Sequence, residues 1–563
     1  MPSPFANETH PVTLLHYFYH WEQQQPDKIY LRQPVGDRYT DYTWGEVGQQ
    51  ARRLATYLNS LGLPPRSNIG LMSKNCAHWI IADLAIMISG HTSVPFYPTL
   101  TGPQLRQVLD HSQCRLLIVG KIDNWPSLKP SVPESFPCVA FPDYSPNASP
   151  PDSDHTQWQA IQEQYEPLTG TTEAEVDAVF SIVYTSGTTG NPKGVMISYR
   201  AVWLLLRACK PYIYPDLPDA RFFAYLQLCH MAERSLVEIL GLYAGGTVYF
   251  AESLDAFAKN LVTARPTHFT AVPRIWAKFQ QGILTKIPQP KLDVLLRIPV
   301  VSDLVKRKIR QGLGLNDARL MGTGAAPMPV PLIQWFRRLG IRIQEAYGQT
   351  ESTAIISFMP PNAIKDGSVG KLLDGLEAQI EPVTGELRVR SNWLMLGYYR
   401  EPALTDAVLH DGWLATGDVG NVDADGYLQI TGRVKDRYKS PKGEYIAPLQ
   451  IELGFADNPY IDQIYVGGQH LPQPIALVVL SDTGKQIARQ LVEQRLVQTV
   501  QELNPRLYPY EHIRKVIVVR DAWSVENDRL TPTMKIKRNA VETHYRPQMD
   551  SWFSQPETII WEE

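Results

Sequence analysis

The stretch Thr185-Ser186-Gly187-Thr188-Thr189-Gly190-Asn191-Pro192-Lys193-Gly194 separates two apolar runs, residues 179–184 and 195–197. Each run has the length and composition of a short strand. Three glycines and four hydroxyl residues give a loop whose backbone N–H groups and hydroxyls can surround a polyphosphate, and Lys193 adds a positive charge. A Walker loop differs, because its lysine opens a helix. The order strand, loop, strand favours nucleotide chemistry outside the P-loop class, although the loop alone also fits a solvated turn.

Length and composition indicate an ordinary globular protein with several cores. The chain has 563 residues, of which 44% are hydrophobic and 20% charged, and its net charge of −3 gives no argument for a nucleic-acid partner. The five cysteines have no metal-like spacing, which favours a reducing compartment. We see no signal peptide, and the best apolar run, residues 79–90, is too short to span a membrane. We expect a cytoplasmic enzyme, and a peripheral membrane contact is compatible with this composition.

The first half of the chain alternates helical patterns with short apolar strands. Residues 44–61 have helical periodicity, and strand patterns follow at 67–72, 92–97 and 115–119. This βαβ rhythm predicts an α/β fold with doubly wound, mainly parallel sheets. The rhythm changes after residue 433, where two strands, a helix over about 484–503 and a strand at 516–519 predict a separate small α+β domain.

Four further segments carry residues suited to nucleotide binding. Gly-Thr-Gly-Ala-Ala-Pro at 322–327 is a small-residue turn that a flat ring could approach closely. Glu-Ala-Tyr-Gly-Gln-Thr-Glu at 345–351 offers an aromatic face, a hydroxyl and a carboxylate. The segment 411–418 ends in Asp418, a carboxylate suited to a ribose diol, and the segment 432–437 is a charged connector at the predicted domain boundary.

With these five segments in view, the chain resembles the adenylate-forming superfamily of acyl-CoA synthetases, adenylation domains and luciferases. Its finer motifs resemble the long- and very-long-chain fatty acyl-CoA synthetase branch. They stand at 228–234 (Leu-Cys-His-Met-Ala-Glu-Arg), 272–279 (Val-Pro-Arg-Ile-Trp-Ala-Lys-Phe), 443–448 (Gly-Glu-Tyr-Ile-Ala-Pro) and 530–538 (Leu-Thr-Pro-Thr-Met-Lys-Ile-Lys-Arg). The resemblance implies a large domain with a distorted barrel subdomain over 1–432, a hinge at 433–437 and a mobile domain over 438–563.

The resemblance also implies roles for individual residues. The groups expected to bind ATP or AMP are Thr185, Ser186, Gly187, Thr188, Thr189, Gly190 and Lys193 at the phosphates, Gly324, Ala325, Ala326, Tyr347 and Gly348 around adenine, Thr350 at the phosphate or acyl carboxylate, and Asp418 and Arg433 at the ribose. Glu351 would hold Mg²⁺. Lys535 aligns with the lysine that bridges the attacking carboxylate and the α-phosphate, and Lys435 occupies the hinge position. Met534 departs from the commoner glycine before that lysine.

The chemistry needs these residue types. A carboxylate that attacks an α-phosphate brings two anions together, so positioned cations are the main catalytic requirement. The expected products are pyrophosphate and an acyl adenylate, which the CoA thiol then converts to acyl-CoA and AMP. The substrates are therefore a fatty acid, ATP and CoA.

Several points leave alternatives open. His230 is either a core histidine or a catalytic residue that borders the acyl pocket, and Gln227 and Arg234 depart from the pattern near the acyl entrance. The tail 544–563 could cap the small domain, reach a partner or touch lipid. A ligase that loads a carrier protein usually carries an insertion that we do not identify between 348 and 433, so CoA is favoured. A non-catalytic nucleotide-binding scaffold would have no need of Lys535.

Overall fold

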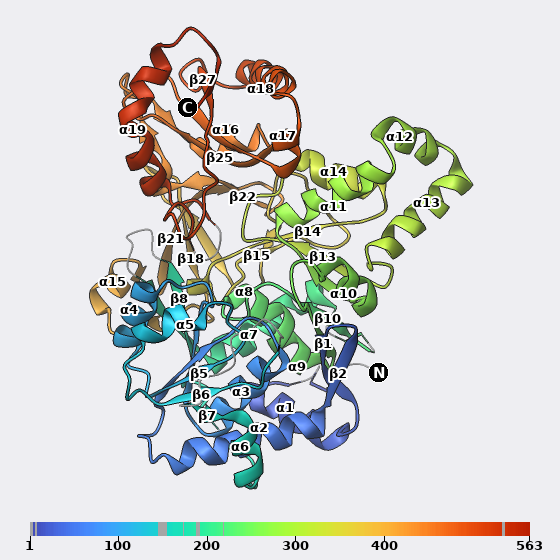
Figure 1. Cartoon of the computed structure of the whole chain (residues 1–563), viewed down its shortest axis with the longest axis vertical. Coiled ribbons are helices and arrows are strands. Elements are labelled where there is room, and N and C mark those ends of the chain that lie inside the picture. The colour runs from blue at the N-terminus through green and yellow to red at the C-terminus, as the bar shows by residue number, and fades with distance from the viewer. Residues whose placement is uncertain are drawn as a thin grey trace.

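The structure is a computed structural model that describes residues 4–5, 8–144, 155–172, 174–186, 192–214, 216–217, 219–531 and 535–563. Figure 1 shows a large domain with a smaller domain at one end, formed by the C-terminal part of the chain. This arrangement, with mainly parallel sheets in the large domain, confirms the predicted fold class.

The large domain contains an eight-stranded sheet whose central strands are parallel. Its spatial order is β19 (Gly397–Tyr398), β9 (Pro192–Ser198), β8 (Val179–Ser186), β4 (Thr92–Phe96), β3 (Asn68–Met72), β5 (Leu116–Val119), β6 (Cys138–Ala140) and β7 (Thr156–Gln157). Strand β9 is antiparallel to both of its neighbours, β8 and β19. The predicted strands at 67–72, 92–97 and 115–119 are therefore observed within a residue or two.

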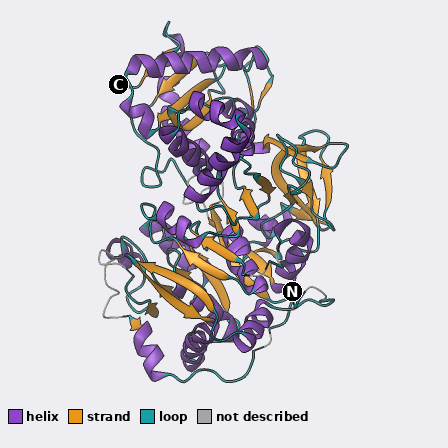
Figure 2. Ribbon diagram, turned by 90° about the vertical axis from the view of Figure 1, so that its right-hand side faces the viewer, coloured by secondary structure: helices purple, strands orange, loops and turns teal. Residues whose placement is uncertain are grey.

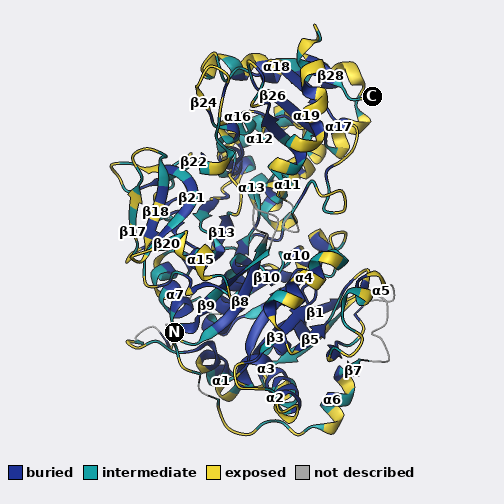
Figure 3. Ribbon diagram, turned by 90° about the vertical axis from the view of Figure 1, so that its left-hand side faces the viewer, coloured by how far each residue is buried: buried dark blue, intermediate teal, exposed yellow. Residues whose placement is uncertain are grey.

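A nine-stranded sheet lies beside the first. Its order is β16 (Lys371–Leu372), β15 (Ser357–Phe358), β14 (Gln344–Tyr347), β13 (Leu320–Thr323), β12 (His268–Thr270), β10 (Arg221–Ala224), β11 (Thr247–Phe250), β1 (Ile29–Val35) and β2 (Arg38–Thr43). Helix α3 (Ala77–Ile88) contacts strands of both sheets and is buried over its whole length. The dark interior strands in Figure 3 show that the cores lie along these sheets.

Helices cover the sheets, and their ends follow local capping rules. Helix α2 (Trp44–Ser60) begins with a capping box between Thr43 and Glu46, and Gly62 adopts φ +62° just after the helix. The other helices of the large domain are α1 (Leu14–Gln24), α4 (Gly102–Ser112), α5 (Trp125–Leu128), α6 (Trp158–Gln164), α7 (Tyr199–Ile213), α8 (Met231–Glu233), α9 (Leu240–Ala244), α10 (Phe257–Ala264), α11 (Pro273–Lys286), α12 (Gln289–Arg297), α13 (Pro299–Gly312), α14 (Val330–Arg338) and α15 (Pro402–Asp406).

A third, antiparallel sheet precedes the small domain in the chain. It consists of β17 (Glu377–Ile380), β18 (Glu386–Arg390), β20 (Leu409–His410), β21 (Trp413–Val422) and β22 (Leu428–Arg433). Strand β22 ends at the short helix η4 (Val434–Asp436), where the chain leaves the large domain.

The small domain is built on a four-stranded sheet with its own apolar cores. After the two-residue strands β23 (Tyr438–Lys439) and β24 (Tyr445–Ile446), its sheet contains β25 (Ile461–Gly467), β26 (Ile475–Leu480), β27 (Lys515–Val518) and β28 (Ile559–Trp561). Its helices α16 (Pro448–Leu453), α17 (Asp482–Gln486), α18 (Arg489–Leu503) and α19 (Arg538–Ser554) cover the sheet (Figure 2).

Two expectations about this domain are refined by the structure. The single helix expected over about 484–503 is divided into α17 and α18, because Ser481 caps a short first helix that ends before Ile487. The tail 544–563 is part of the small domain itself, since α19 packs on the sheet and β28 pairs in parallel with β27.

Candidate active site

The predicted strand, loop and strand form a β-hairpin. Strands β8 and β9 are antiparallel, with Thr185 opposite Lys193 and Ser186 opposite Pro192. The tip residues Gly187, Thr188, Thr189 and Gly190 lie outside the described residues, so the hairpin fixes only the two sides of the predicted phosphate loop. The Lys193 ammonium lies 5.0 Å from the centre of the Tyr398 ring, a cation–π contact.

Tyr398 connects two predicted site residues, and the sequence reasoning missed it. Its hydroxyl donates a 2.8 Å hydrogen bond to Oε1 of Glu351, while its ring faces Lys193. The backbone reinforces this link, because the Met395 N–H donates to the Glu351 carbonyl and the Tyr399 N–H donates to the Gly194 carbonyl. The segment 395–399 therefore ties the phosphate-loop hairpin to the turn that carries Glu351. No local pattern marks Tyr398, because its partners are distant in sequence.

The small-residue turn and Tyr347 follow adjacent parallel strands, β13 and β14. Gly324 packs so closely that a Cβ there would lie 2.9 Å from the Ala346 carbonyl oxygen, and one at Gly348 would lie 2.0 Å from that of Ala354. Ala325 adopts φ +64°, and Ala325 and Ala326 are exposed. The structure thus presents an open small-residue surface beside the aromatic ring, and neither glycine accommodates a side chain without backbone movement.

Asp418 contacts two other predicted site residues, Tyr347 and Arg433. It is buried, faces Arg433 across the β21–β22 pair, and accepts a 3.0 Å contact from the guanidinium Nε. The Tyr347 hydroxyl donates to its other oxygen at 2.7 Å. Burial and the Asp418 charge raise the pKa of the Tyr347 phenol well above its ordinary value, so the hydroxyl stays a donor. These contacts fix Tyr347, Asp418 and Arg433 as one unit.

Lys535 reaches this unit from the small domain. A backbone hydrogen bond holds it in place, since the Thr531 N–H donates to the Lys535 carbonyl at 2.8 Å. Although the residue is exposed to solvent, desolvation by the surrounding protein is the largest effect on its ammonium group and lowers its pKa. The Arg433 charge acts in the same direction, and the Asp418 and Glu351 carboxylates oppose it. The small domain is therefore placed with Lys535 among the predicted nucleotide-binding charges.

His230 belongs to the same neighbourhood. It caps α8, and its Nδ1 accepts a 3.2 Å hydrogen bond from the Ala232 N–H. Burial, together with the positive charge of Lys535, lowers its pKa to about 4. The ring is therefore neutral at pH 7, and with Nδ1 as the acceptor its proton is on Nε2. A functional His230 would act as a neutral donor.

Two other predicted residues lie in short helices. Thr350 is buried at the start of η3 (Thr350–Ser352), next to Glu351. Lys435 is exposed within η4, at the passage between the two domains. Both positions are compatible with the predicted roles, and the contacts of these two side chains do not test those roles.

Arg234, noted as a departure from the family pattern near the acyl entrance, is a residue of the protein core. Its side chain is fully buried and forms an ion pair with Asp83 on α3 and a 3.0 Å pair with Glu238. It also donates to the Ser181 hydroxyl at 2.6 Å. Opposite charges contributed by α3 and by the π-helix at Arg234–Ile239 compensate this cation inside the core.

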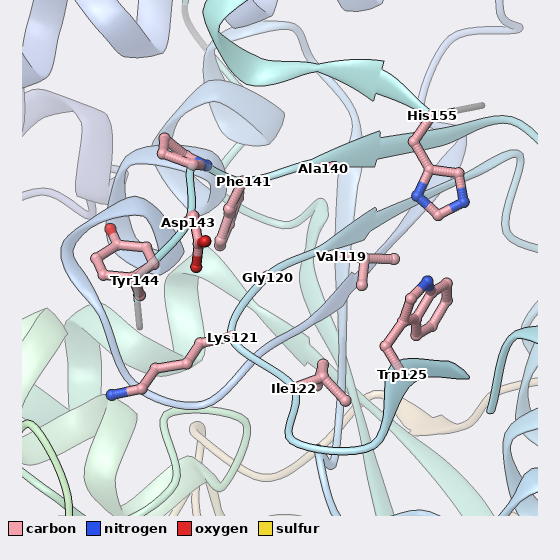
Figure 4. Close-up of a pocket in the computed structure, with 11 residues that line it drawn as sticks. Val119, Gly120, Lys121, Ile122, Trp125, Ala140, Phe141, Asp143, Tyr144 and His155 are labelled. Carbon is pink, nitrogen blue, oxygen red and sulfur yellow. The ribbon is translucent and has the colours of Figure 1, made fainter. Parts of the chain in front are cut away.

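A separate pocket lies at the ends of β5 and β6, away from the motif residues (Figure 4). Lys121, Trp125, Asp143 and His155 are among its lining residues, and none of the predicted site residues lines it. In the part of the chain that the structure describes, no group of three or more His, Cys, Asp or Glu side chains could hold a metal ion.

Comparisons with known proteins agree with this arrangement. A family model described as AMP-binding enzyme matches residues 18–399, and a model of the AMP-binding enzyme C-terminal domain matches residues 436–557. Long-chain-fatty-acid–CoA ligase FadD15 of Mycobacterium tuberculosis is 27% identical over 99% of both chains. Long chain acyl-CoA synthetase 6, peroxisomal, of Arabidopsis thaliana is 28% identical over 100% of this chain and 88% of its own.

Solved structures show the same fold. The adenylation domain of a carboxylate reductase from Mycobacterium chelonae superposes with a TM-score of 0.80 at 20% identity, covering 98% of this chain and 92% of that one. O-succinylbenzoate coenzyme A synthetase from Bacillus subtilis, solved with ATP and a magnesium ion, gives 0.70 at 21% identity, covering 93% and 98%. Among the described residues, no helix has the length and apolar character needed to cross a bilayer. Because the first model spans well over half of the chain, this protein belongs to the AMP-binding enzyme family.

Proposed function

We propose that this protein activates a long-chain fatty acid with ATP and transfers the acyl group to CoA. The observation that carries the proposal is the convergence of Lys535, Arg433, Asp418 and Glu351 on one site, to which the two domains contribute. The named relatives are long-chain fatty acid ligases and align over nearly the whole chain, which supports this substrate class.

In the first step, the carboxylate of the fatty acid attacks the α-phosphate of ATP and pyrophosphate leaves. Lys535 would lie between the two anionic groups and reduce their repulsion, while Lys193, Thr185 and the loop between them would bind the outer phosphates. Asp418 would accept hydrogen bonds from the ribose hydroxyls, and Tyr347 would stack on the adenine that rests against Gly324, Ala325 and Ala326. No acid–base pair is needed, because the attacking carboxylate is ionised at neutral pH.

Glu351 fits a magnesium site completed by the nucleotide. It contributes one carboxylate, held in place by the Tyr398 hydroxyl, and Mg²⁺ commonly binds to one or two carboxylates together with substrate phosphates. When bound, the cation would offset the charge of the departing pyrophosphate. The protein's own part is to hold Glu351 in a fixed direction through Tyr398.

In the second step, the thiol of CoA attacks the acyl adenylate, forming the thioester and releasing AMP. We propose that the division into a large domain over 1–432, a hinge at 433–437 and a mobile domain over 438–563 serves this change of step. Rotation about Lys435 would withdraw Lys535 after adenylation and admit CoA. His230, neutral and carrying its proton on Nε2, would donate to the carbonyl oxygen of the acyl adenylate or to the departing AMP.

The test is ATP–pyrophosphate exchange with Mg²⁺ across saturated fatty acids of increasing length, followed by addition of CoA. The proposal predicts exchange that depends on a long-chain acid and a thioester product once CoA is present. Exchange without thioester formation would assign the chain to carrier-protein loading instead. Absence of exchange with every fatty acid would refute fatty acid activation.

A further inference from the structure

Helices α12 and α13 form a hairpin that projects from the side of the large domain (Figure 1). Its inner side is anchored, since Leu292 is 1% and Ile309 9% exposed and both belong to one apolar core with β12 and β13. These buried apolar residues hold the hairpin on the domain. The side chains on its outer side do not take part in that packing.

The turn of the hairpin exposes large apolar side chains. Val300 is 83% exposed, and Val294, Ile298 and Leu304 are 57%, 47% and 50% exposed. These four side chains lie within eleven consecutive residues. Elsewhere in the described part of the chain, the exposed large apolar side chains are scattered. Isolated apolar residues on a surface need no explanation, but a contiguous group on a protruding element indicates an interaction site.

Cations surround this apolar turn. The segment 286–310 has seven basic residues and two acidic ones in a chain of net charge −3, namely Lys286, Lys291, Arg297, Lys306, Arg307, Lys308 and Arg310 against Asp293 and Asp303. Asp293 is already paired with Arg338. Among the described residues, Lys291, Arg307 and Lys308 form no ion pair, so their charges are available to an external anion.

Helical spacing places the cations and the apolar residues on the same outer stripes. On α12, Lys291, Val294 and Arg297 recur every three residues, and all three are exposed. On α13, Val300 and Leu304 precede Arg307 and Lys308 at spacings of four, three and four, and all are exposed. On α13 the stripe is apolar towards the turn and basic towards the body of the domain, and on α12 the basic residues Lys291 and Arg297 stand on either side of Val294.

We propose that the α12–α13 hairpin docks this protein on an anionic membrane surface. The apolar turn would enter the boundary between headgroups and acyl chains, and the basic residues behind it would lie at the level of the anionic headgroups. A polar protein surface would match the cations but would leave Val300 and Leu304 facing polar groups. The bilayer satisfies both parts of the surface at once, and this docking is independent of the proposed chemistry.

Co-sedimentation of the full chain with vesicles tests the proposal. We expect binding to equal parts of phosphatidylglycerol and phosphatidylcholine, little binding to phosphatidylcholine alone, and release in about 1 M NaCl, where the Debye length is about 3 Å. The double variants Val300→Ser/Leu304→Ser and Arg307→Glu/Lys308→Glu should each bind at least about ten-fold less. The matched controls Val383→Ser, at a residue 88% exposed elsewhere, and Arg342→Glu/Lys485→Glu should bind as the unchanged chain does.

A second readout locates the contact. All five native cysteines are buried, so an environment-sensitive NBD label can be confined to Val300→Cys or to the control Val383→Cys. The label at 300 should shift its emission to the blue on anionic vesicles, and the label at 383 should not. Failure of the unchanged chain to sediment with anionic vesicles would overturn the proposal and leave an acidic protein as the occupant. Equal binding by the hairpin variants and the controls would overturn it as well.

Discussion

At the scale of single residues, the position of the Lys535 charge predicts that the two half-reactions depend on this residue to different degrees. Its ammonium group is placed near Arg433, Asp418 and Glu351, a position useful while two anions are brought together. We expect Lys535→Ala to lower acyl-AMP formation by about a thousand-fold or more. Conversion of supplied acyl-AMP to acyl-CoA should stay within a few-fold of the unchanged enzyme, because that step brings no second anion to the α-phosphate.

Pyrophosphate release and thioester formation measured separately check this prediction. Lys537→Ala is a suitable control, since Lys537 lies in the same basic run but is paired with Asp528. Normal adenylation by Lys535→Ala would remove Lys535 from the proposed role.

Tyr398 offers a test of how Glu351 is held. Tyr398→Phe keeps the ring beside Lys193 and removes the hydroxyl that donates to Glu351. A hydrogen bond to a charged group contributes roughly 1.5–3 kcal/mol, so we expect the Mg²⁺ concentration for half-maximal exchange to rise about ten-fold, with a smaller change in kcat. Titration of exchange activity with Mg²⁺ measures this. Tyr399→Phe, whose hydroxyl is 3.5 Å from Gln113, is the control, and an unchanged Mg²⁺ requirement in Tyr398→Phe would contradict the role.

At the scale of elements, the hinge prediction concerns η4. The chain passes from β22 through Lys435 into the small domain, and proline there would fix φ near −65° and remove one N–H. We expect Lys435→Pro to retain adenylation within about three-fold and to reduce thioester formation at least ten-fold, because only the second step requires rotation. Both half-reactions should be measured on one preparation, with Lys435→Ala as the control for loss of the charge. Equal losses in both half-reactions would exclude a hinge role.

The range of each contact along the chain determines which parts of the site could be predicted from the sequence. The hairpin around 185–194, the turn after β13 and the residues of 345–351 are local motifs at strand ends, so their positions follow from spacing and composition. Tyr398 reaches Lys193 and Glu351 only because β19 pairs with β9, a contact between residues some 200 positions apart. The burial of Arg234 could not be predicted for a similar reason, because its compensating carboxylate Asp83 is on a helix far from it in sequence. Long-range pairing leaves no local signal in a single sequence.

At the scale of the whole molecule, buried carboxyl groups make stability depend on pH. Burial, assisted by the Asp366 charge, raises the pKa of Glu345 to about 8. In the unfolded chain this pKa returns to about 4.3, so between the two values the folded state binds more protons. The protonated Glu345 carboxyl group therefore adds to the unfolding free energy at low pH, and this addition is lost as the pH rises through about 8.

We therefore expect Glu345→Gln to weaken this pH dependence. The loss of unfolding free energy between pH 6 and pH 9 should be smaller in the variant by roughly 2 kcal/mol. Denaturant unfolding at the two pH values measures the difference, and the exposed Glu134→Gln serves as the control. Glu233, whose pKa burial also raises to about 8, remains in both proteins, so part of the dependence should persist. A Glu345→Gln profile parallel to that of the unchanged chain would contradict the assignment.

The parallel pairing of β28 with β27 has a practical consequence for anyone who shortens this chain. A boundary at residue 557 would remove Ile559–Trp561 and convert β27, now an interior strand, into an edge. The freed backbone groups of Val516 and Val518 would then be open to strands from other molecules. Val516 and Ile517, both now without exposed area, would border that edge. Such a fragment should self-associate, so poor behaviour of a shortened small domain would reflect a lost strand rather than an intrinsic defect of its fold.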